Sequence, residues 1–153
     1  MKYSDANYEQ IKRIAEEFPS TLVVMLYDDA LENLDIAIGA IEAEDIEERF
    51  RASERVADIL YNLCISLDLE NGGQVSENLA ALYKHGIQQM TDINFSNDPA
   101  VAESLKRVLE PLRDSWAELD DRIRAEVAEA EAMFTPAYVA DASKRSHLKP
   151  VTF

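Results

Sequence analysis

Four long stretches of this 153-residue chain repeat apolar residues at spacings of three and four, with short turn-forming runs between them. This spacing follows the 3.6-residue turn of an α-helix, so each stretch predicts a helix with a broad apolar face. The chain holds 4 Gly and 5 Pro, too few turn formers for a many-stranded β-protein. Apolar residues make up 47% of the sequence, enough for the core of one domain. The sequence therefore predicts a single all-α domain.

The turn-forming residues set the limits of the expected helices. Pro19 suits a helix start, because its missing N–H would be unpaired there anyway, and Gly72-Gly73 suits a helix end. We expect helices over residues 19–42, 45–70, 74–93 and 99–133. Short connections make neighbouring helices antiparallel, which predicts an up-down-up-down four-helix bundle. Pro111 lies inside the last helix and should bend or split it.

Segments at the two ends fall outside this pattern. Residues 1–18 carry Tyr8, Ile11 and Phe18 at helical spacing, which predicts a short N-terminal cap helix lying on the bundle of residues 19–133. Residues 134–153 contain two Pro and little periodicity. We expect this C-terminal extension to be a flexible tail.

The charge balance limits the classes of partner. The formal net charge is −15, and an acidic surface repels phosphate, so we expect neither nucleic acid nor an anionic membrane as a partner. The longest apolar runs are far shorter than the roughly 18 residues that a membrane span needs. With a single cysteine and no leader pattern, the sequence predicts a cytoplasmic protein without membrane insertion.

The search for chemistry in the sequence finds no catalytic, cofactor or metal site. Di-iron bundles use Glu-x-x-His pairs on one helix face, but Leu82 precedes His85 by three residues and Lys144 precedes His147 by three. Cys64 lies on an apolar stripe, where a thiol is inert. We therefore expect a protein that is not an enzyme; an enzyme built on a carboxylate or on His85 is the least favoured alternative.

Each of the first three helices shows a second apolar stripe beside the first. In the first helix Leu26 lies on the main stripe and Leu31 on the second, and in the third helix Tyr83 lies on the second. The second stripes indicate either a thick core, a dimer interface, or a groove that receives an amphipathic helix of a partner. On the groove interpretation, Tyr83→Ala should weaken partner binding more than folding, while Leu26→Ala should lower stability.

Two strings of residues occur in a fixed order along the chain. The first string is Leu26-Tyr27-Asp28, with Tyr8, Pro19 and Leu22 before it. The second comprises Gly72-Gly73, Asn78-Leu79, Leu82-Tyr83, Asn94, Asp98 and Trp116. Together they resemble a known family, the flagellin export chaperones (FliS). The resemblance covers about residues 8–120. This sequence departs from the family pattern at Glu17-Phe18, Asp29, His85 and Gln88-Gln89.

The resemblance implies a cytoplasmic chaperone that binds the C-terminal segment of flagellin in apolar grooves. Such a chaperone prevents early polymerisation and delivers its client to a flagellar export gate component, and the N-terminal segment can cover the groove until flagellin displaces it. The candidate partner-binding residues are Tyr8, Ile11, Tyr27, Leu31, Asn78, Leu82, Tyr83, Ile87 and Asn94. The alternative is a structural or homodimeric bundle that binds another amphipathic-helix partner. Capping or loop roles explain the asparagines equally well.

Overall fold

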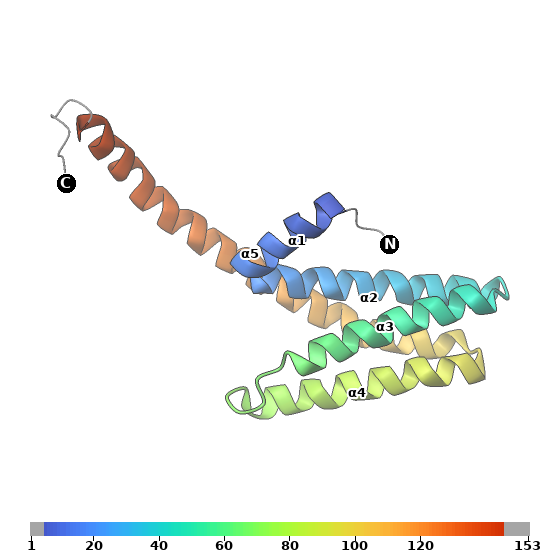
Figure 1. The fold of residues 1–153 in the computed structure, drawn as a ribbon. Coiled ribbons are helices and arrows are strands. Elements are labelled where there is room, and N and C mark those ends of the chain that lie inside the picture. Colours follow the sequence, from blue (N-terminus) through green and yellow to red (C-terminus); the bar gives the residue numbers. More distant parts are fainter. Residues whose placement is uncertain (1–4, 146–153) are drawn as a thin grey trace.

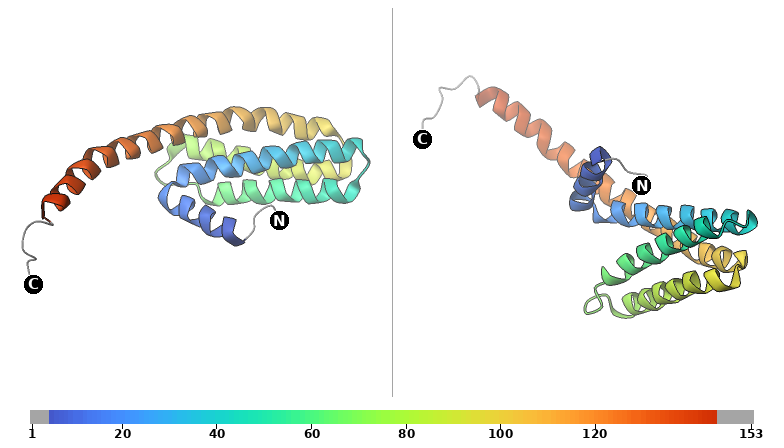
Figure 2. Two further views of the ribbon diagram at one scale, coloured as in Figure 1. Left: turned by 90° about the horizontal axis from the view of Figure 1, so that it is seen from above. Right: turned by 45° about the vertical axis from the view of Figure 1, so that its right-hand side comes forward.

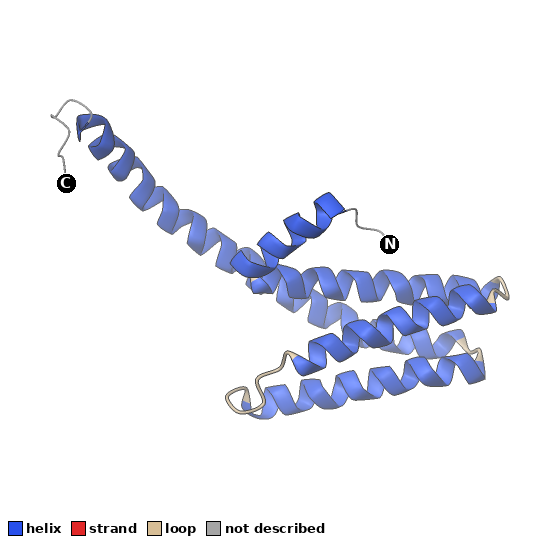
Figure 3. Cartoon of the chain, viewed as in Figure 1, coloured by secondary structure: helices blue, strands red, loops and turns tan. Residues whose placement is uncertain are grey.

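The computed structural model describes residues 5–145 of the chain, with the side chains of residues 8–14 and 16–134. Every element of this described part is helical (Figure 3), which confirms the all-α class. The helices are α1 (Asp5–Glu17), α2 (Pro19–Glu42), α3 (Ile46–Ile65), α4 (Gly73–Ser96) and α5 (Pro99–Arg145). The limits of α2 and α4 lie close to those expected from the sequence, whereas α3 ends at Ile65, earlier than the expected end at residue 70.

Helices α2 to α5 pack side by side, and successive helices run in alternating directions (Figure 1). Helix α2 contacts both α3 and α5, α3 contacts α4, and α4 makes a smaller contact with α5. Among the described helices, α1 contacts α2 and none of the others. The expected N-terminal helix therefore exists, but it rests on one helix and does not extend across the bundle.

Local chemistry explains where the helices begin and end. Pro19 occupies the first turn of α2, and Asp45 caps α3 by accepting a hydrogen bond from the Glu48 amide at 3.1 Å. Both arrangements satisfy or remove amides that have no helical partner. Helix α4 ends at Asn97, whose φ of 51° is left-handed. Asparagine tolerates this backbone conformation better than most residues do.

Helix α5 is longer than the sequence indicated. It spans 47 residues, passes through Pro111 without a break, and curves away from the other helices (Figure 2). Pro111 is exposed, so water can bond the Arg107 carbonyl that loses its helical partner there. Residues 134–145, expected to belong to a flexible tail, continue the helix α5, and residues 146–153 lie outside the described part of the chain.

The expected apolar face of α3 is buried only in part. On the stripe that runs from Ile46 through Leu60 in the sequence, Ser53 and Leu60 are buried but Ile46 and Phe50 are exposed. The residues expected to widen that face, Val56, Ile59 and Leu63, lie in the core. The buried side of α3 is thus shifted towards these three residues, because its neighbours α2 and α4 decide which side they cover.

Candidate partner-binding surface

Tyr27 and Tyr83, both predicted to bind a partner, meet inside the bundle. Their side chains are 0% and 2% exposed, and their hydroxyl oxygens lie 2.6 Å apart in a hydrogen bond. The bond links α2 to α4, which otherwise lie diagonally across the bundle without backbone contact. In this conformation both tyrosines are enclosed by the bundle, so a partner cannot reach them.

Burial also changes the acidity of the tyrosine pair. Burial raises the pKa of Tyr27 above its ordinary value, and the hydrogen bond to Tyr83 adds to the rise. The pKa of Tyr83 is raised as well, mainly by burial. Both hydroxyls thus stay neutral at physiological pH, and the pair acts as an internal polar link.

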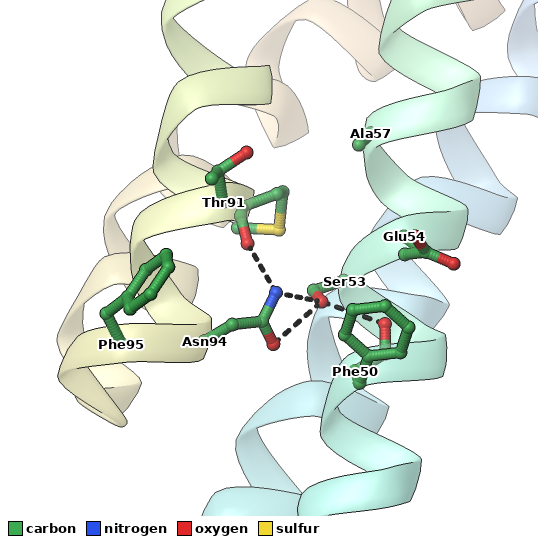
Figure 4. Close-up of a pocket in the computed structure, with 8 residues that line it drawn as sticks. Phe50, Ser53, Glu54, Ala57, Thr91, Asn94 and Phe95 are labelled. Carbon is green, nitrogen blue, oxygen red and sulfur yellow. Dashed lines mark hydrogen bonds between the residues drawn. The ribbon is translucent and has the colours of Figure 1, made fainter.

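Asn94, a third predicted partner residue, instead joins the end of α4 to α3 (Figure 4). Its side-chain nitrogen donates to Ser53 Oγ at 3.1 Å and to the Met90 carbonyl at 3.2 Å. Buried Arg49 donates from Nη2 to the Asn94 carbonyl at 3.2 Å, and from Nη1 to Asn97 Oδ1 at 2.7 Å. Both amide hydrogens of Asn94 are therefore used within the molecule, and a partner-binding role for this amide is not supported.

The other six predicted residues divide by exposure. Leu31, Leu82 and Ile87 are half-buried and pack against the core. Tyr8 of α1 and Asn78 of α4 are exposed, and Ile11 is half-buried. The structure thus does not gather the predicted residues into one site.

A pocket opens between α3 and α4 at the end of the bundle where Asn94 lies (Figure 4). Its volume is about 330 Å³, and Phe50 and Phe95 stand on its two sides. The Phe50 ring is 49% exposed and the Phe95 ring 87% exposed. Such exposure is unusual for phenylalanine, which is most often buried. The residues that line the pocket are Phe50, Ser53, Glu54, Ala57, Met90, Thr91, Asn94 and Phe95.

The pocket lies on a longer apolar surface of α3. This surface, called here the α3 outer stripe, consists of Ile46, Phe50, Ala57, Tyr61 and Ile65. Their spacing places them on one side of the helix, and all except half-buried Ala57 are exposed. In the sequence, Ile46, Phe50 and Ala57 fall on the apolar face expected for this helix, whereas the structure leaves Ile46 and Phe50 exposed. An exposed apolar strip of this kind is typical of a protein-binding surface.

Ion pairs connect α2 to both of its neighbours in the bundle. Asp28 accepts from Arg113 of α5 at 2.7 Å, and Asp29 accepts from Arg55 Nη2 of α3 at 2.5 Å. The Asp that follows Leu26-Tyr27 thus holds α5 beside α2, and the next Asp holds α3. The side chains of these pairs are partly exposed to water, so each pair contributes only modestly to stability.

Neither a metal-binding cluster nor a membrane-spanning helix is found in the described part of the chain. Among residues whose side chains are described, no group of three or more His, Cys, Asp or Glu could hold a metal ion. Within the described helices, none has the length and apolar character needed to cross a membrane.

Comparison with known proteins gives consistent matches over the bundle. The sequence model of the family "Flagellar protein FliS" matches residues 2–123. The flagellar secretion chaperone FliSB of Pseudomonas aeruginosa is 30% identical over 112 residues, which are 71% of this chain and 89% of that protein. FliS of Campylobacter jejuni is 34% identical over 67% of this chain and 80% of its own length. FliS of Salmonella typhimurium is 29% identical over 68% and 78%.

Proposed function

This chain belongs to the FliS family of flagellar secretion chaperones, which are not enzymes, and we propose that its client is the C-terminal segment of flagellin. The observation that carries the proposal is the α3 outer stripe with the pocket at its end. Residues 46–65 of α3 extend over about 28 Å. This surface is long enough for a client helix of similar length to lie along it. An amphipathic helix of flagellin could lie along the stripe and place an apolar side chain between Phe50 and Phe95.

The energetics of ordering the client favour a long surface over a single pocket. Each residue of a disordered segment that becomes helical loses about 1–2 kcal/mol of backbone entropy. One large apolar side chain buried in the pocket returns only about 1.5–3 kcal/mol. A client segment therefore needs many contacts along α3 in addition to the pocket, and the succession of exposed apolar residues from Ile46 to Ile65 supports such a mode.

The α3 outer stripe is open in this conformation. Among the described helices α1 contacts α2 alone, so client binding at α3 does not require α1 to be displaced. Of the sequence-predicted residues, Tyr8 and Asn78 are exposed and could contact further parts of the client directly. Leu31, Leu82 and Ile87 could contribute the partly exposed sides of their side chains.

The chaperone is proposed to act in the cytoplasm and to keep flagellin subunits apart before export. In the cytoplasm, the chaperone covers apolar stripes of flagellin that would otherwise pair with other flagellin subunits, and it carries the client to a component of the export gate. An antiparallel up-down-up-down bundle of α2 to α5 is the proposed scaffold. The alternating helix directions in Figure 1 and the contacts of α2 with α3 and α5 support this arrangement.

Binding measurements with purified flagellin test the client assignment. Calorimetry should show binding to full-length flagellin and none to flagellin that lacks its C-terminal segment; equal binding to both would reject the proposal. Phe50→Ala should weaken binding about tenfold or more, since removal of a central aromatic anchor has effects of this size. Val108→Ala on α5 is the matched control, because Val108 is exposed to a similar degree and does not line the pocket.

A further inference from the structure

Helix α5 projects well beyond the helices that it packs against. Near the edge of the bundle, buried Asp120 ties α5 to the start of α2, since its Oδ1 accepts a hydrogen bond from Ser20 Oγ at 2.8 Å. Every side chain from residue 125 to residue 134 is exposed. Residues 125–145 would extend over about 30 Å as a helix. The family match ends at residue 123, so this projection is a feature of this chain rather than of the family pattern.

The projecting segment continues the apolar face that α5 buries in the bundle. Within the bundle this face contains Ala102, Leu105, Leu109, Leu112 and Trp116. Ile123, Val127, Ala130 and Phe134 follow at the same spacing of three and four, and we call these four residues the α5 outer stripe. Phe134 is 76% exposed. Along the bundle, α2 packs against α5; Ile123, at the edge of the bundle, is half-buried, and Val127, Ala130 and Phe134 are exposed.

A helix in this position gains stability from a packing partner, because most of the stability of helices in proteins comes from the packing of an apolar face. Pro136 lies inside the projecting segment, where it removes a backbone hydrogen bond at a cost of roughly 3 kcal/mol relative to Ala. Packing against another helix would offset this cost, and such a helix would run opposite to α5, as α2 does.

The charges beside the α5 outer stripe complement one another when two copies pair antiparallel. If Val127 of one copy is level with Ala130 of a second, then Phe134 is level with Ile123, and Arg124 lies beside Glu131. Because the dimer has two-fold symmetry, the pair of Arg124 with Glu131 occurs once on each side. In a parallel pair, by contrast, Glu126 of one copy would lie beside Glu131 of the other, and like charges repel. Arg124 is about half exposed and already neighbours Asp120 and Asp121, but its guanidinium has five donors.

We propose that the α5 outer stripe is a self-association surface, through which two copies of this chain pair antiparallel into a homodimer. The pairing is isologous, as expected for a two-fold dimer. It leaves the α3 outer stripe free, so it is independent of the proposed client site. Each dimer would then present two client sites that project from a central pair of helices.

Analytical ultracentrifugation of the full chain tests the pairing. From about 1 μM to about 1 mM, the mass should rise towards twice the 17.2 kDa of one chain. Phe134→Asp should raise the dissociation constant about tenfold or more, while Phe50→Ala should leave it unchanged. A monomer at every concentration, or a dimer that Phe134→Asp does not weaken, would overturn the proposal.

A charge exchange tests the antiparallel arrangement. Arg124→Glu and Glu131→Arg should each weaken self-association, because each brings like charges together in its own dimer. An equimolar mixture of the two variants should regain association, since the mixed dimer restores both opposite-charge pairs. Failure of the mixture to associate more tightly than either variant would overturn the antiparallel pairing. Circular dichroism confirms that each variant remains folded.

The same variants separate this inference from the proposed function. Phe134→Asp should retain flagellin binding, and Phe50→Ala should retain self-association. If flagellin occupied the α5 outer stripe instead of a second copy, Phe134→Asp would weaken flagellin binding and leave the mass of the free chain unchanged. That outcome would overturn the homodimer and would leave the chaperone assignment in place.

Discussion

The hydrogen bond between Tyr27 and Tyr83 should behave as a coupled unit. Tyr27→Phe or Tyr83→Phe removes one hydroxyl and leaves the other buried without this partner, 2.6 Å from where the first oxygen was. A buried polar group that loses its partner costs about 1–3 kcal/mol of unfolding free energy. For a chain of this size, that corresponds to a fall in Tm of roughly 3–9 °C.

The double variant distinguishes the coupled pair from two independent hydroxyls. When both tyrosines become phenylalanine, no hydroxyl of the pair remains unsatisfied, so the double variant should lose no more stability than either single variant. Urea denaturation of the four proteins gives the interaction energy, which we expect to be about 1–3 kcal/mol. Losses that simply add, or single losses too small to measure, would refute the reasoning that this buried bond links α2 to α4.

Further predictions concern pH, packing and the junction of α2 with α5. Because the pKa of Tyr27 is raised in the folded state, its stabilising contribution is complete below about pH 10 and falls as the pH rises further; Tyr27→Phe should reduce this alkaline loss in melts between pH 8 and pH 11. A Cβ on Gly86 would lie 2.7 Å from Leu60 Cδ1, so Gly86→Ala should lower the unfolding free energy by about 1 kcal/mol, the repacking cost exceeding the gain in helix propensity. Gly39→Ala, at a site where nothing lies within 4 Å of the added Cβ, should raise it by about 0.5–1 kcal/mol, and urea titrations that place both changes on the same side of wild type would contradict this account. Asp120→Ala removes a buried acceptor of a charge-assisted hydrogen bond and should lower the unfolding free energy by about 1.5–3 kcal/mol. Hydrogen exchange of the backbone amides at the start of α2 should become faster; unchanged exchange there would show that this contact does not hold the helix.

The role of Gly86 shows how packing changes the meaning of a residue. From the sequence, Gly86 is one member of an apolar stripe of α4. In the structure it is the point where the side chains of Leu60 and Leu105 approach the backbone of α4. No local pattern predicts this, because the contact depends on residues far apart in the chain. The same holds for Asn94, whose amide is used by Ser53 and Met90.

For Tyr27 and Tyr83, the sequence identifies the family but does not tell whether the side chains are buried. The strings Leu26-Tyr27-Asp28 and Leu82-Tyr83 identify the family correctly, and both contribute to the interior of the bundle. A tyrosine has an apolar body and a polar tip, so its type alone fits a wet surface or a satisfied core equally well. The missing information was the second hydroxyl at 2.6 Å.

The sequence by itself determined the helical class, the limits of α2 and α4, and the family, because these depend on spacing, on capping residues and on the order of short motifs. Only the tertiary structure decided which apolar stripe of each helix is covered, since any of several faces could be buried until neighbouring helices take their places. In the structure, Tyr83 therefore lies in the core and Phe50 is exposed. It also showed that α5 continues past the bundle to Arg145, where the apolar spacing persists but no described helix covers it.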